Sequence, residues 1–566
     1  MKRLRLSYIC LFAVLALSMT MGPGRKKDTR KSSDSRVHLL HADRLYFNQL
    51  QHPTAQFLVG NVQLEHDGTL MFCDSALFYE ATNSFDAFDH VKMKQGDTLS
   101  LISDILFYDG MDQIARARYN VVLKHRESTL YADSLDYDRL YDLGYFFEGG
   151  RLVDKDNELT SDWGEYNLST RNAVFNYNVR LVNPRPPKEA RSVLVGDTLH
   201  YNTRTGIAHV LGPSNIDNGN NHIYTIDGYY DSNTEESFLL QRSILQNGYK
   251  VLVGDSVYWN GKDSVGKAYG HAVYTDTLNK NKFVGNYALY DDKAGYAEAA
   301  DSAVLIDYSQ KDTFYAHADS FFLYTFHINT DSVYRMLHAY HHVRAYRVDI
   351  QAVCDSMVYD GRDSCTTMYK DPIVWQDGQQ LLGEMIKAWR NDSTIDSVYV
   401  INQALSVERI DSVHYNQVAS KEMHSYFKEG DIYLTVADMN VYVNYFPFDD
   451  DSLMIGMNHT ESSQMKIFLT DRKVDKIWMP EASGVMYPLT LVPPGELYLE
   501  NFAWFDYVRP LDKDDIFNWR PKKSGTELKE SVRRTAPRQR LEDVKEKKKE
   551  NKERNKNGNV SDTGTP

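Results

Sequence analysis

The chain has few of the residues that break or cross-link folded chains. Its 566 residues include 16 Pro, 32 Gly and 4 Cys. So little Pro and Gly excludes a low-complexity body, and so few Cys exclude a disulfide scaffold. Lys and Arg number 64 against 78 Asp and Glu, a formal net charge of −14. Because nucleic-acid binding needs a basic face, we expect no nucleic-acid partner.

Long apolar runs are also scarce, and the one at the N-terminus, Leu6 to Met19, follows Lys2, Arg3 and Arg5. It is short for a membrane-spanning helix but suits the apolar part of a signal peptide. We therefore predict a signal peptide over residues 1–22 and export. No Ala-x-Ala cleavage site follows, so retention as an N-terminal anchor in the inner membrane stays open.

Aromatic strand formers are abundant, with 39 Tyr and 24 Phe, and many lie in one repeated phrase. An apolar residue stands three positions before an aspartate, a small residue directly before it, an apolar residue two after it and often an aromatic four after it. Leu130-Tyr-Ala-Asp133-Ser-Leu-Asp-Tyr137 is one copy. The aspartates recur about every thirty residues, a spacing typical of repeat architectures. Eight of them define the repeat: Asp43, Asp74, Asp104, Asp133, Asp162, Asp197, Asp227 and Asp255.

The spacing within each copy predicts a bend at the aspartate. Side chains of a strand alternate every two residues, but the small residue and the next apolar residue lie three apart. A bulge or sharp bend absorbs that slip, and an aspartate there can satisfy a freed backbone amide. We expect these eight aspartates to be structural corners without a catalytic role.

The segments between the aspartates also alternate, as in Phe57-Leu-Val-Gly-Asn-Val-Gln-Leu64, and polar turns separate them. Sustained helical periodicity is missing from the body of the chain. The sequence therefore predicts an all-β protein built from repeated hairpin units of about thirty residues, with several segments in series.

Motifs of catalysis and cofactor binding are missing, including the P-loop, Gly-x-Ser-x-Gly and His-Glu-x-x-His. We predict no enzyme activity and no cofactor. His338, His341 and His342 lie close together, but they alternate as in an exposed strand, and no metal site is predicted. Cys354 and Cys365 can pair across a hairpin or remain small core residues, as Cys73 can.

The first copies of the repeat contain four short phrases in a fixed order: Ala42-Asp43-Arg44-Leu45, Gly60-Asn61-Val62-Gln63-Leu64, His66-Asp67-Gly68 and Cys73-Asp74-Ser75-Ala76. In this order they resemble the OstA-like, LptA-type periplasmic lipopolysaccharide-transport proteins. The resemblance is clear over residues 37 to 200 and weaker to about 365. It implies an elongated, twisted, open β-jellyroll whose apolar interior holds lipid A acyl chains. It also implies a periplasmic protein that works with inner- and outer-membrane transport components.

These observations divide the chain into segments. After residues 1–22 we expect a first jellyroll segment over 37–190 and a second over 191–365. A divergent β-rich module follows over 366–515, where the phrase blurs. Residues 521–566 are rich in Lys, Glu, Arg and Asn and predict a disordered, charged tail.

The resemblance implies lipopolysaccharide or a similar lipid as the ligand. A long apolar trough suits such a ligand, since each acyl methylene removed from water is worth about 0.8 kcal/mol. Open strand edges at the ends of the repeat also predict head-to-tail self-association. Residues two and four after the corners are expected to line the trough, although the same positions suit an ordinary sealed core: Leu45, Phe47, Ala76, Phe78, Leu106, Tyr108, Leu135 and Tyr137.

Two alternatives remain from the sequence alone. An exported β-solenoid that binds or acts on polysaccharide can also be acidic and rich in Asp and Tyr. A structural surface protein can share the same repeat. The slip at each aspartate favours the bent-strand repeat over a regular solenoid, and lipid binding separates transport from a structural role.

Overall fold

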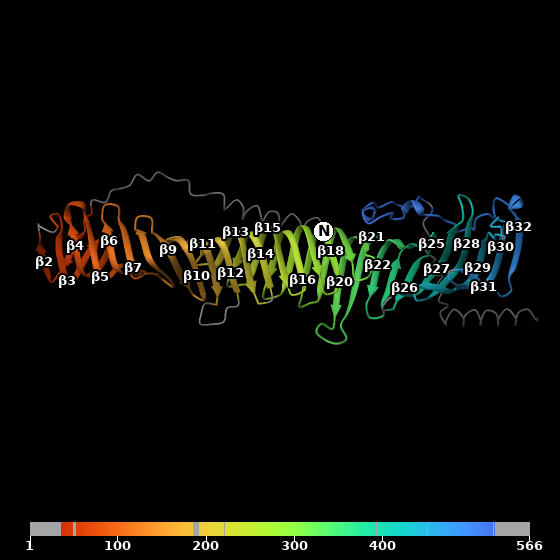
Figure 1. The fold of residues 1–566 in the computed structure, drawn as a ribbon, viewed down its shortest axis with the longest axis horizontal. Helices are drawn as coiled ribbons and strands as arrows, with labels where there is room; N and C mark the ends of the chain where they lie inside the picture. Colours follow the sequence, from red (N-terminus) through yellow and green to blue (C-terminus); the bar gives the residue numbers. More distant parts are fainter. Residues whose placement is uncertain are drawn as a thin grey trace, which may run out of the picture. The chain divides into compact units, whose positions relative to one another are not determined.

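The computed structural model describes residues 35–48, 52–184, 192–219, 221–376, 378–391, 394–449, 451–471, 473–524 and 526. The predicted signal peptide and nearly all of the predicted tail lie outside these residues. The chain divides into two compact units. Unit 1 comprises the residues up to Gly248 with Tyr258–Lys262, and unit 2 comprises Tyr249–Val257 with the residues from Asp263 onward. Both units are built almost entirely from β-strands (Figure 1), which confirms the all-β prediction.

Unit 1 is a run of β-strands joined by tight turns. Most of these strands are 11 or 12 residues long. Its elements are β1 (His38–His41), β2 (Arg44–Phe47), β3 (Gln56–His66), β4 (Thr69–Tyr79), the short 3-10 helix η1 (Glu80–Thr82), β5 (Ser84–Gln95), β6 (Leu99–Asp109), β7 (Ile114–His125), β8 (Ser128–Asp138), β9 (Leu143–Asp154), β10 (Asn157–Asn167), β11 (Asn172–Asn183), β12 (Ser192–Asn202), β13 (Ile207–Asn218), β14 (Asn221–Asp231) and β15 (Glu236–Asn247).

The residues of β16 (Lys250–Asn260) are divided between the two units. Unit 2 continues with β17 (Val265–Asp276), β18 (Asn281–Asp291), β19 (Tyr296–Asp307), β20 (Phe314–Phe326), β21 (Tyr334–Arg347), β22 (Ile350–Asp360), β23 (Cys365–Tyr369), β24 (Ile373–Gln376), β25 (Gln379–Leu382), β26 (Met385–Arg390), β27 (Ile395–Arg409), β28 (Tyr415–Lys428), β29 (Asp431–Tyr445), β30 (Gly456–Thr470), β31 (Lys473–Trp478), β32 (Ser483–Pro488) and the 3-10 helices η2 (Leu489–Leu491), η3 (Asp506–Val508) and η4 (Asp515–Phe517).

From β3 to β15, neighbouring strands of unit 1 pair antiparallel in chain order, and the register shifts once in the middle of each pair. Between β4 and β5, Phe72 faces Lys92, but the next paired residue, Ser75, faces Phe88. The extra residue lies on β5, where two consecutive residues adopt positive φ angles, 63° at Asp89 and 49° at His90. Two successive left-handed residues turn the strand sharply, so each strand pair is bent.

The bend changes which residues of a strand face the interior. In β4 the buried side chains are Met71 and Cys73 before Asp74, and Ala76 and Phe78 after it. Each strand therefore contributes to two walls that meet at the bends. We call wall A the wall that holds the first halves of even-numbered strands in unit 1, such as Thr69–Cys73, and wall B the wall that holds their second halves. The strand ends form the mouth, opposite the bends.

The two walls of unit 1 pack against each other. A Cβ placed on Gly144, in wall B, would lie 3.4 Å from Cδ2 of Leu123 in wall A. Large side chains fill the space between the walls, with Phe85, Phe146 and Tyr137 almost completely buried. The core of unit 1 is therefore the space enclosed by the bent strands.

Unit 2 uses the same bent strand, including the part where the sequence phrase blurs. Asn402 and Gln403 in β27, and Met439 and Asn440 in β29, form positive-φ pairs at register shifts like those of unit 1. The strand break between β25 and β26 coincides with the bend at Gly383–Glu384, and both short strands pair with β27. The predicted segment limits near residues 190 and 365 stay predictions.

After β32 the chain runs back over unit 2 as a segment of little regular structure, which we call the C-terminal strap, residues 496–522. Its Leu499, Phe505 and Val508 are buried with Ile373 and Trp375 in one apolar cluster. These two residues alternate with Val374, which faces the interior, so the strap covers the outer face of wall A.

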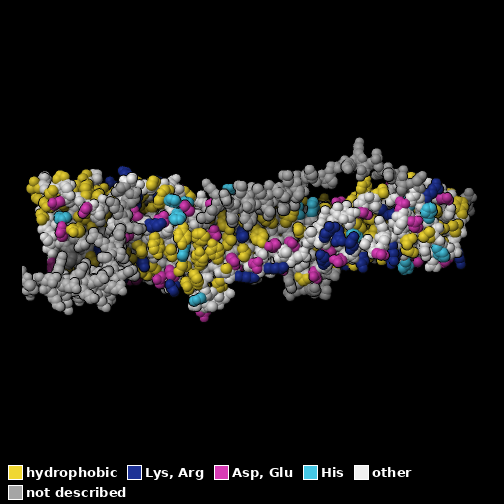
Figure 2. Space-filling view, turned by 180° about the vertical axis from the view of Figure 1, so that it is seen from behind, with side chains coloured by type: hydrophobic (Ala, Val, Ile, Leu, Met, Phe, Trp, Pro, Cys, Tyr) yellow, Lys and Arg dark blue, Asp and Glu magenta, His cyan; other side chains and the backbone are white. Residues whose placement is uncertain are grey.

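Figure 2 shows apolar side chains interspersed with charged ones over the face that it displays. Single exposed apolar residues of this kind are ordinary on protein surfaces. Among the described residues, no helix has the length and apolar character needed to span a membrane.

Candidate functional site

The structure separates the eight predicted trough residues into two groups. Leu45 and Phe47 lie on β2, each 53% exposed, at the edge of the sheet of unit 1. The other six are buried between walls A and B: Ala76, Phe78, Leu106, Tyr108, Leu135 and Tyr137. A ligand can reach these six only if the walls of unit 1 separate.

Seven of the eight predicted corner aspartates lie where the strand changes the side that it turns inward: Asp43, Asp74, Asp104, Asp133, Asp162, Asp197 and Asp255. Asp227 lies one residue further on. Thr225 and Gly228 are the buried residues on either side of the bend in β14, so Ile226 takes the position that aspartate holds elsewhere. The carboxylate of Asp227 contacts Nε2 of His209 at 3.0 Å.

Several corner aspartates accept a hydrogen bond from the side chain of the second positive-φ residue on the neighbouring strand. Asn120 Nδ2 lies 2.6 Å from Asp104, and Asn178 Nδ2 lies 2.6 Å from Asp162. His90 lies 2.8 Å from Asp74, and this hydrogen bond and the charge of Asp74 raise the pKa of His90.

The partner of each aspartate is the main feature that the sequence interpretation missed. The signal was present, because Asn or His recurs 16 residues after the aspartate in these pairs. Glycine takes the first positive-φ position at Gly60, where a Cβ would lie 2.3 Å from Oδ2 of Asp43. The bend therefore depends on residues of two strands.

Tyrosines four residues after the corner close the mouth of unit 1. Tyr108 at the end of wall B lies 2.7 Å from Nδ1 of His66 at the end of wall A. Arg139 donates to the same hydroxyl at 2.5 Å. All three side chains are buried, and burial raises the pKa of Tyr108 to about 12 and lowers the pKa of His66.

The same contact recurs along unit 1 with different partners. Tyr137 donates to Gln95 at 3.3 Å, Tyr166 lies 3.1 Å from Nδ1 of His125, and Tyr201 donates to Asp154 at 2.9 Å. We call these, with the Tyr108–His66 contact, the mouth hydrogen bonds. Each joins wall B to wall A, so they hold the interior of unit 1 shut.

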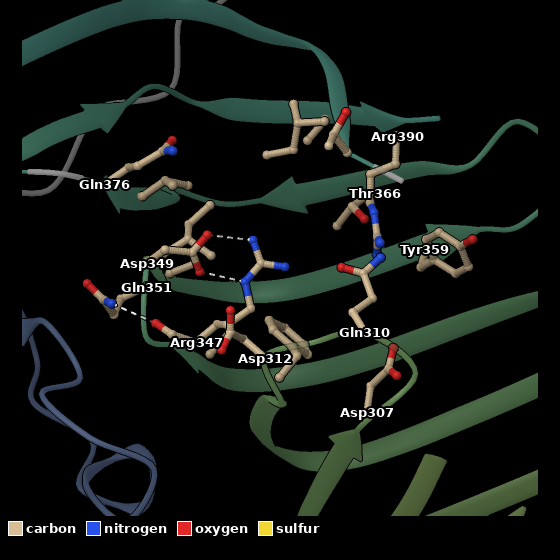
Figure 3. A pocket seen from close by; sticks show the side chains of 18 of the residues that line it. Asp307, Gln310, Asp312, Arg347, Asp349, Gln351, Tyr359, Thr366, Gln376 and Arg390 are labelled. Carbon is tan, nitrogen blue, oxygen red and sulfur yellow. Dashed lines mark hydrogen bonds and ion pairs between the residues drawn. The ribbon is translucent and has the colours of Figure 1, made fainter. Parts of the chain in front are cut away.

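In unit 2 the walls leave an open cavity of about 730 Å³ (Figure 3). Its apolar surface includes Leu337, Met357 and Met368, and its mouth is lined by polar residues from both walls. A cavity of this size with an apolar interior and a few polar groups matches the usual character of small-ligand sites.

Small side chains explain why the cavity exists. In β25–β26, Glu384 takes the corner position and accepts a hydrogen bond from Asn402 Nδ2 at 3.1 Å. The residue four positions later, where unit 1 carries its tyrosines, is Ala388. Ala388 and Ala352 on the opposite wall are both half-buried and line the cavity. No side chain at this point bridges the walls.

The mouth of the cavity carries charges of both signs. Arg347 makes a two-pronged ion pair with Asp349, at 2.6 and 3.0 Å. Arg390 lies on the other side of the opening in Figure 3, and among the described residues it has no carboxylate within ion-pair distance. Lys311, Asp307 and Asp312 complete the charged rim.

The C-terminal strap is bonded to this rim. Arg509 donates to Oε1 of Gln351 at 2.7 Å, and Gln351 donates to the backbone carbonyl of Arg347 at 2.8 Å. Further along wall A, buried amides bond the strap backbone in the same way, with Gln380 donating to Ala503 and Gln417 to Leu497. The strap thus fixes the wall that carries Arg347.

The histidines singled out in the sequence lie on β21 and have separate partners. His341 contacts Asp355 at 3.3 Å, whereas His342 contacts Asp319 at 3.1 Å. Within the described ranges, no three or more His, Cys, Asp or Glu side chains gather in a way that could hold a metal ion. Cys73, Cys354 and Cys365 are buried free thiols.

Two sheet edges expose apolar side chains. In unit 1, β1 and β2 both pair with β3 and expose Leu40, Tyr46 and Phe47. In unit 2, β31 and β32 both pair with β30 and expose Trp478 and Val485. Apolar edge strands of this kind can pair with strands of another chain.

Comparison with known proteins gives a match for part of the chain. Residues 34–186, which include β1 to β11, match the family model of OstA-like proteins. Curated proteins give no match. Among solved structures, a similar chain is LptH from Pseudomonas aeruginosa, described as the LptA homologous periplasmic component of the conserved lipopolysaccharide transport device. The identity is 15%, the match covers 21% of this chain and 81% of that chain, and the TM-score is 0.18. Residues 34–186 are thus similar to OstA-like proteins, as the repeated phrases of this segment predict.

Proposed function

We propose that the chain is an exported, periplasmic lipid-bridging protein of lipopolysaccharide transport, which holds acyl chains of lipopolysaccharide or a similar lipid between walls A and B. The observation that carries the proposal is the OstA-like match over residues 34–186, which coincides with bent strands enclosing an apolar core. The proposed role is binding and transfer of the lipid, without chemistry on it.

The interior of unit 1 supports this role if its walls separate. Leu106, Leu135 and Phe78 present apolar surface toward the opposite wall, and the mouth hydrogen bonds are the polar contacts that must break. A typical hydrogen bond contributes about 0.5–1.5 kcal/mol to stability, whereas each buried methylene gains about 0.8 kcal/mol. An acyl chain of ordinary length therefore offsets several such bonds.

The exposed edges support a bridge of several copies. We propose that β1 and β2 of one copy add to the β31–β32 edge of another, with inner- and outer-membrane transport components as further partners. Sedimentation of the wild type should show self-association, and Phe47→Asp should weaken it because it places a charge on the exposed edge. A monomeric wild type would contradict this part of the proposal.

The test of lipid binding uses a photoreactive residue on either side of one wall. Benzoyl-phenylalanine replaces the inward Phe78 in one variant and the outward Phe107 in the other, and each folded protein is irradiated with lipopolysaccharide. We expect cross-links from position 78 and few from position 107. Equal cross-linking, or no lipid binding together with binding of a glycan, would refute the proposal in favour of a polysaccharide-binding protein.

A further inference from the structure

The cavity of unit 2 is the part of the described chain whose shape and charges point furthest toward a ligand. Its lining comes from strands β19 to β28 and the turns between them, ending at Gly430, all within unit 2. In contrast with the interior of unit 1, it is open without any movement of the walls. We infer that this cavity binds a single amphiphile, with its acyl chain against Leu337, Met357 and Met368 and an anionic head group at Arg390. The inference rests on the proposed function, because it assumes that the interior accepts acyl chains.

The apolar part of the cavity fits a flexible chain. Met357 and Met368 come from the adjacent strands β22 and β23, where they face each other in the register. Methionine side chains adapt to irregular apolar ligands because they are unbranched and polarisable. Ala345, Ala352 and Ala388 leave the room that larger residues would occupy.

Of the two arginines at the mouth of the cavity, only one is available to bind an anionic head group. Arg347 is already satisfied by its two-pronged ion pair with Asp349. Arg390 has no carboxylate partner among the described side chains and is half-buried at the rim of the cavity. A guanidinium in that state gains most from a phosphate or carboxylate, which it can bind through two parallel hydrogen bonds.

Asp307 and Asp312 restrict where an anion can lie. Asp307 ends β19 and Asp312 lies in the β19–β20 connection, and the carboxylate of Asp307 already accepts a hydrogen bond from the backbone amide of Ser309 at 2.9 Å. Arg390 ends β26 on the opposite wall. An anionic head group is therefore favoured on the β26 side, with the β19–β20 connection facing the polar remainder of the head.

The inference is tested with the full chain and two fluorescent probes of equal chain length, a palmitate analogue and the corresponding alcohol. Ala388→Tyr places at the cavity the residue type that closes unit 1, and we expect it to weaken both probes at least about ten-fold. Arg390→Gln should weaken the palmitate probe about ten-fold and the alcohol little, because it removes a charge-assisted hydrogen bond. Arg362→Gln is the matched control, since Arg362 lies in an exposed turn of unit 2 outside the cavity.

Ala352→Phe fills the cavity from the other wall and replaces Ala388→Tyr if that variant fails to fold, as judged by circular dichroism. Wild-type affinity in the folded cavity-filling variant would overturn the site. Equal effects of Arg390→Gln on both probes would overturn the anionic head group. Cross-linking of lipopolysaccharide from position 78 distinguishes the two claims. If lipopolysaccharide still cross-links to position 78 while the cavity variants bind the probes normally, the proposed function stands and the cavity site fails. If lipopolysaccharide does not cross-link to position 78 in the protein with an unaltered cavity, the proposed function fails, whatever the cavity binds.

Discussion

Units 1 and 2 use the same bent strand but treat the space between the walls differently. In unit 1, Tyr108, Tyr137, Tyr166 and Tyr201 bond across the mouth and large side chains fill the interior. In unit 2, Ala388 takes the corresponding position, the interior holds a cavity, and the strap supports wall A from outside. The backbone repeat therefore sets the walls, and the side chains that the two walls carry at the mouth decide together whether they close, since Tyr359, four positions after Asp355, lines the open cavity.

The largest expected effect comes from detaching the strap. Arg344 is completely buried and donates to the carbonyls of Val508 and Asp515, at 2.8 and 3.3 Å. Its pKa is lowered to about 10 by burial, although Asp515 opposes that shift. Arg344→Ala leaves the carbonyls of Val508 and Asp515 without this donor, at a typical cost of about 1–3 kcal/mol for each buried group, whereas the Asp515 carboxylate keeps its ion pair with Arg520. Denaturant unfolding of unit 2, with Arg362→Ala as control, measures the loss. An unchanged unfolding midpoint would show that the strap does not support unit 2.

The next effect comes from opening the mouth of unit 1. Tyr108→Phe removes the hydroxyl that Arg139 and His66 share and leaves two buried polar groups without this partner, at a cost of about 1–3 kcal/mol. Tyr119→Phe is the control, because Tyr119 is exposed at a bend. The free energy of unfolding of unit 1 is the measurement. Equal values for the two variants would mean that the hydroxyl does not hold the walls together.

A pH change should weaken the same contacts. Burial lowers the pKa of His66, with Asp67 opposing and Arg139 adding to the shift, and burial also lowers the pKa of His125. The unfolded chain takes up these protons first, near the ordinary histidine pKa of about 6.5. The stability of unit 1 is therefore present above that pH and falls as the pH drops below it. Thermal unfolding at pH about 7.5 and 5.5 should show the loss, and His66→Gln should reduce it. An equal loss in His66→Gln would exclude His66 as a source.

The smallest effect is expected at a single bend. Asn120→Ala loses the hydrogen bond to Asp104 and keeps a side chain at a φ of 50°, so we expect a loss of about 1–2 kcal/mol. Asn120→Gly loses the hydrogen bond but tolerates the backbone angle, so its loss should be smaller. Both are measured by chemical denaturation. If Asn120→Gly is less stable than Asn120→Ala, the positive φ angle does not determine the loss of stability.

Much of the repeat could be predicted because alternation of apolar residues is a local signal. The three-residue interval between Ala132 and Leu135 is enough to predict a bend at Asp133, and these two residues bound the register shift between β8 and β9. The alignment on aspartate placed Asp227 one residue too late, because burial at Thr225 and Gly228 sets the bend in β14. Asp alone was therefore an incomplete marker.

The rest depends on contacts between distant residues, which alternation does not encode. The Tyr108–His66 contact joins residues 42 apart, and Gln417 meets the strap 80 residues later. The cavity exists because Ala388 has a small side chain, and this residue lies outside the part of the chain where the repeated phrase is recognisable. The six trough residues found buried were placed on the interior side by sequence, but whether the walls open to a lipid around them stays a prediction.

The most direct measurement maps where a chain first enters. A photoreactive palmitate analogue is mixed with the full chain at neutral pH, irradiated, and its adducts are located by peptide mass spectrometry. The account predicts that at the lowest probe concentrations adducts form within residues 305–430, around Met357 and Met368, and that the interior of unit 1 is labelled only at higher concentrations, because its walls must separate first. Adducts concentrated on Leu106, Leu135 and their neighbours, with none in the cavity, would contradict the claim that unit 1 is shut and unit 2 open.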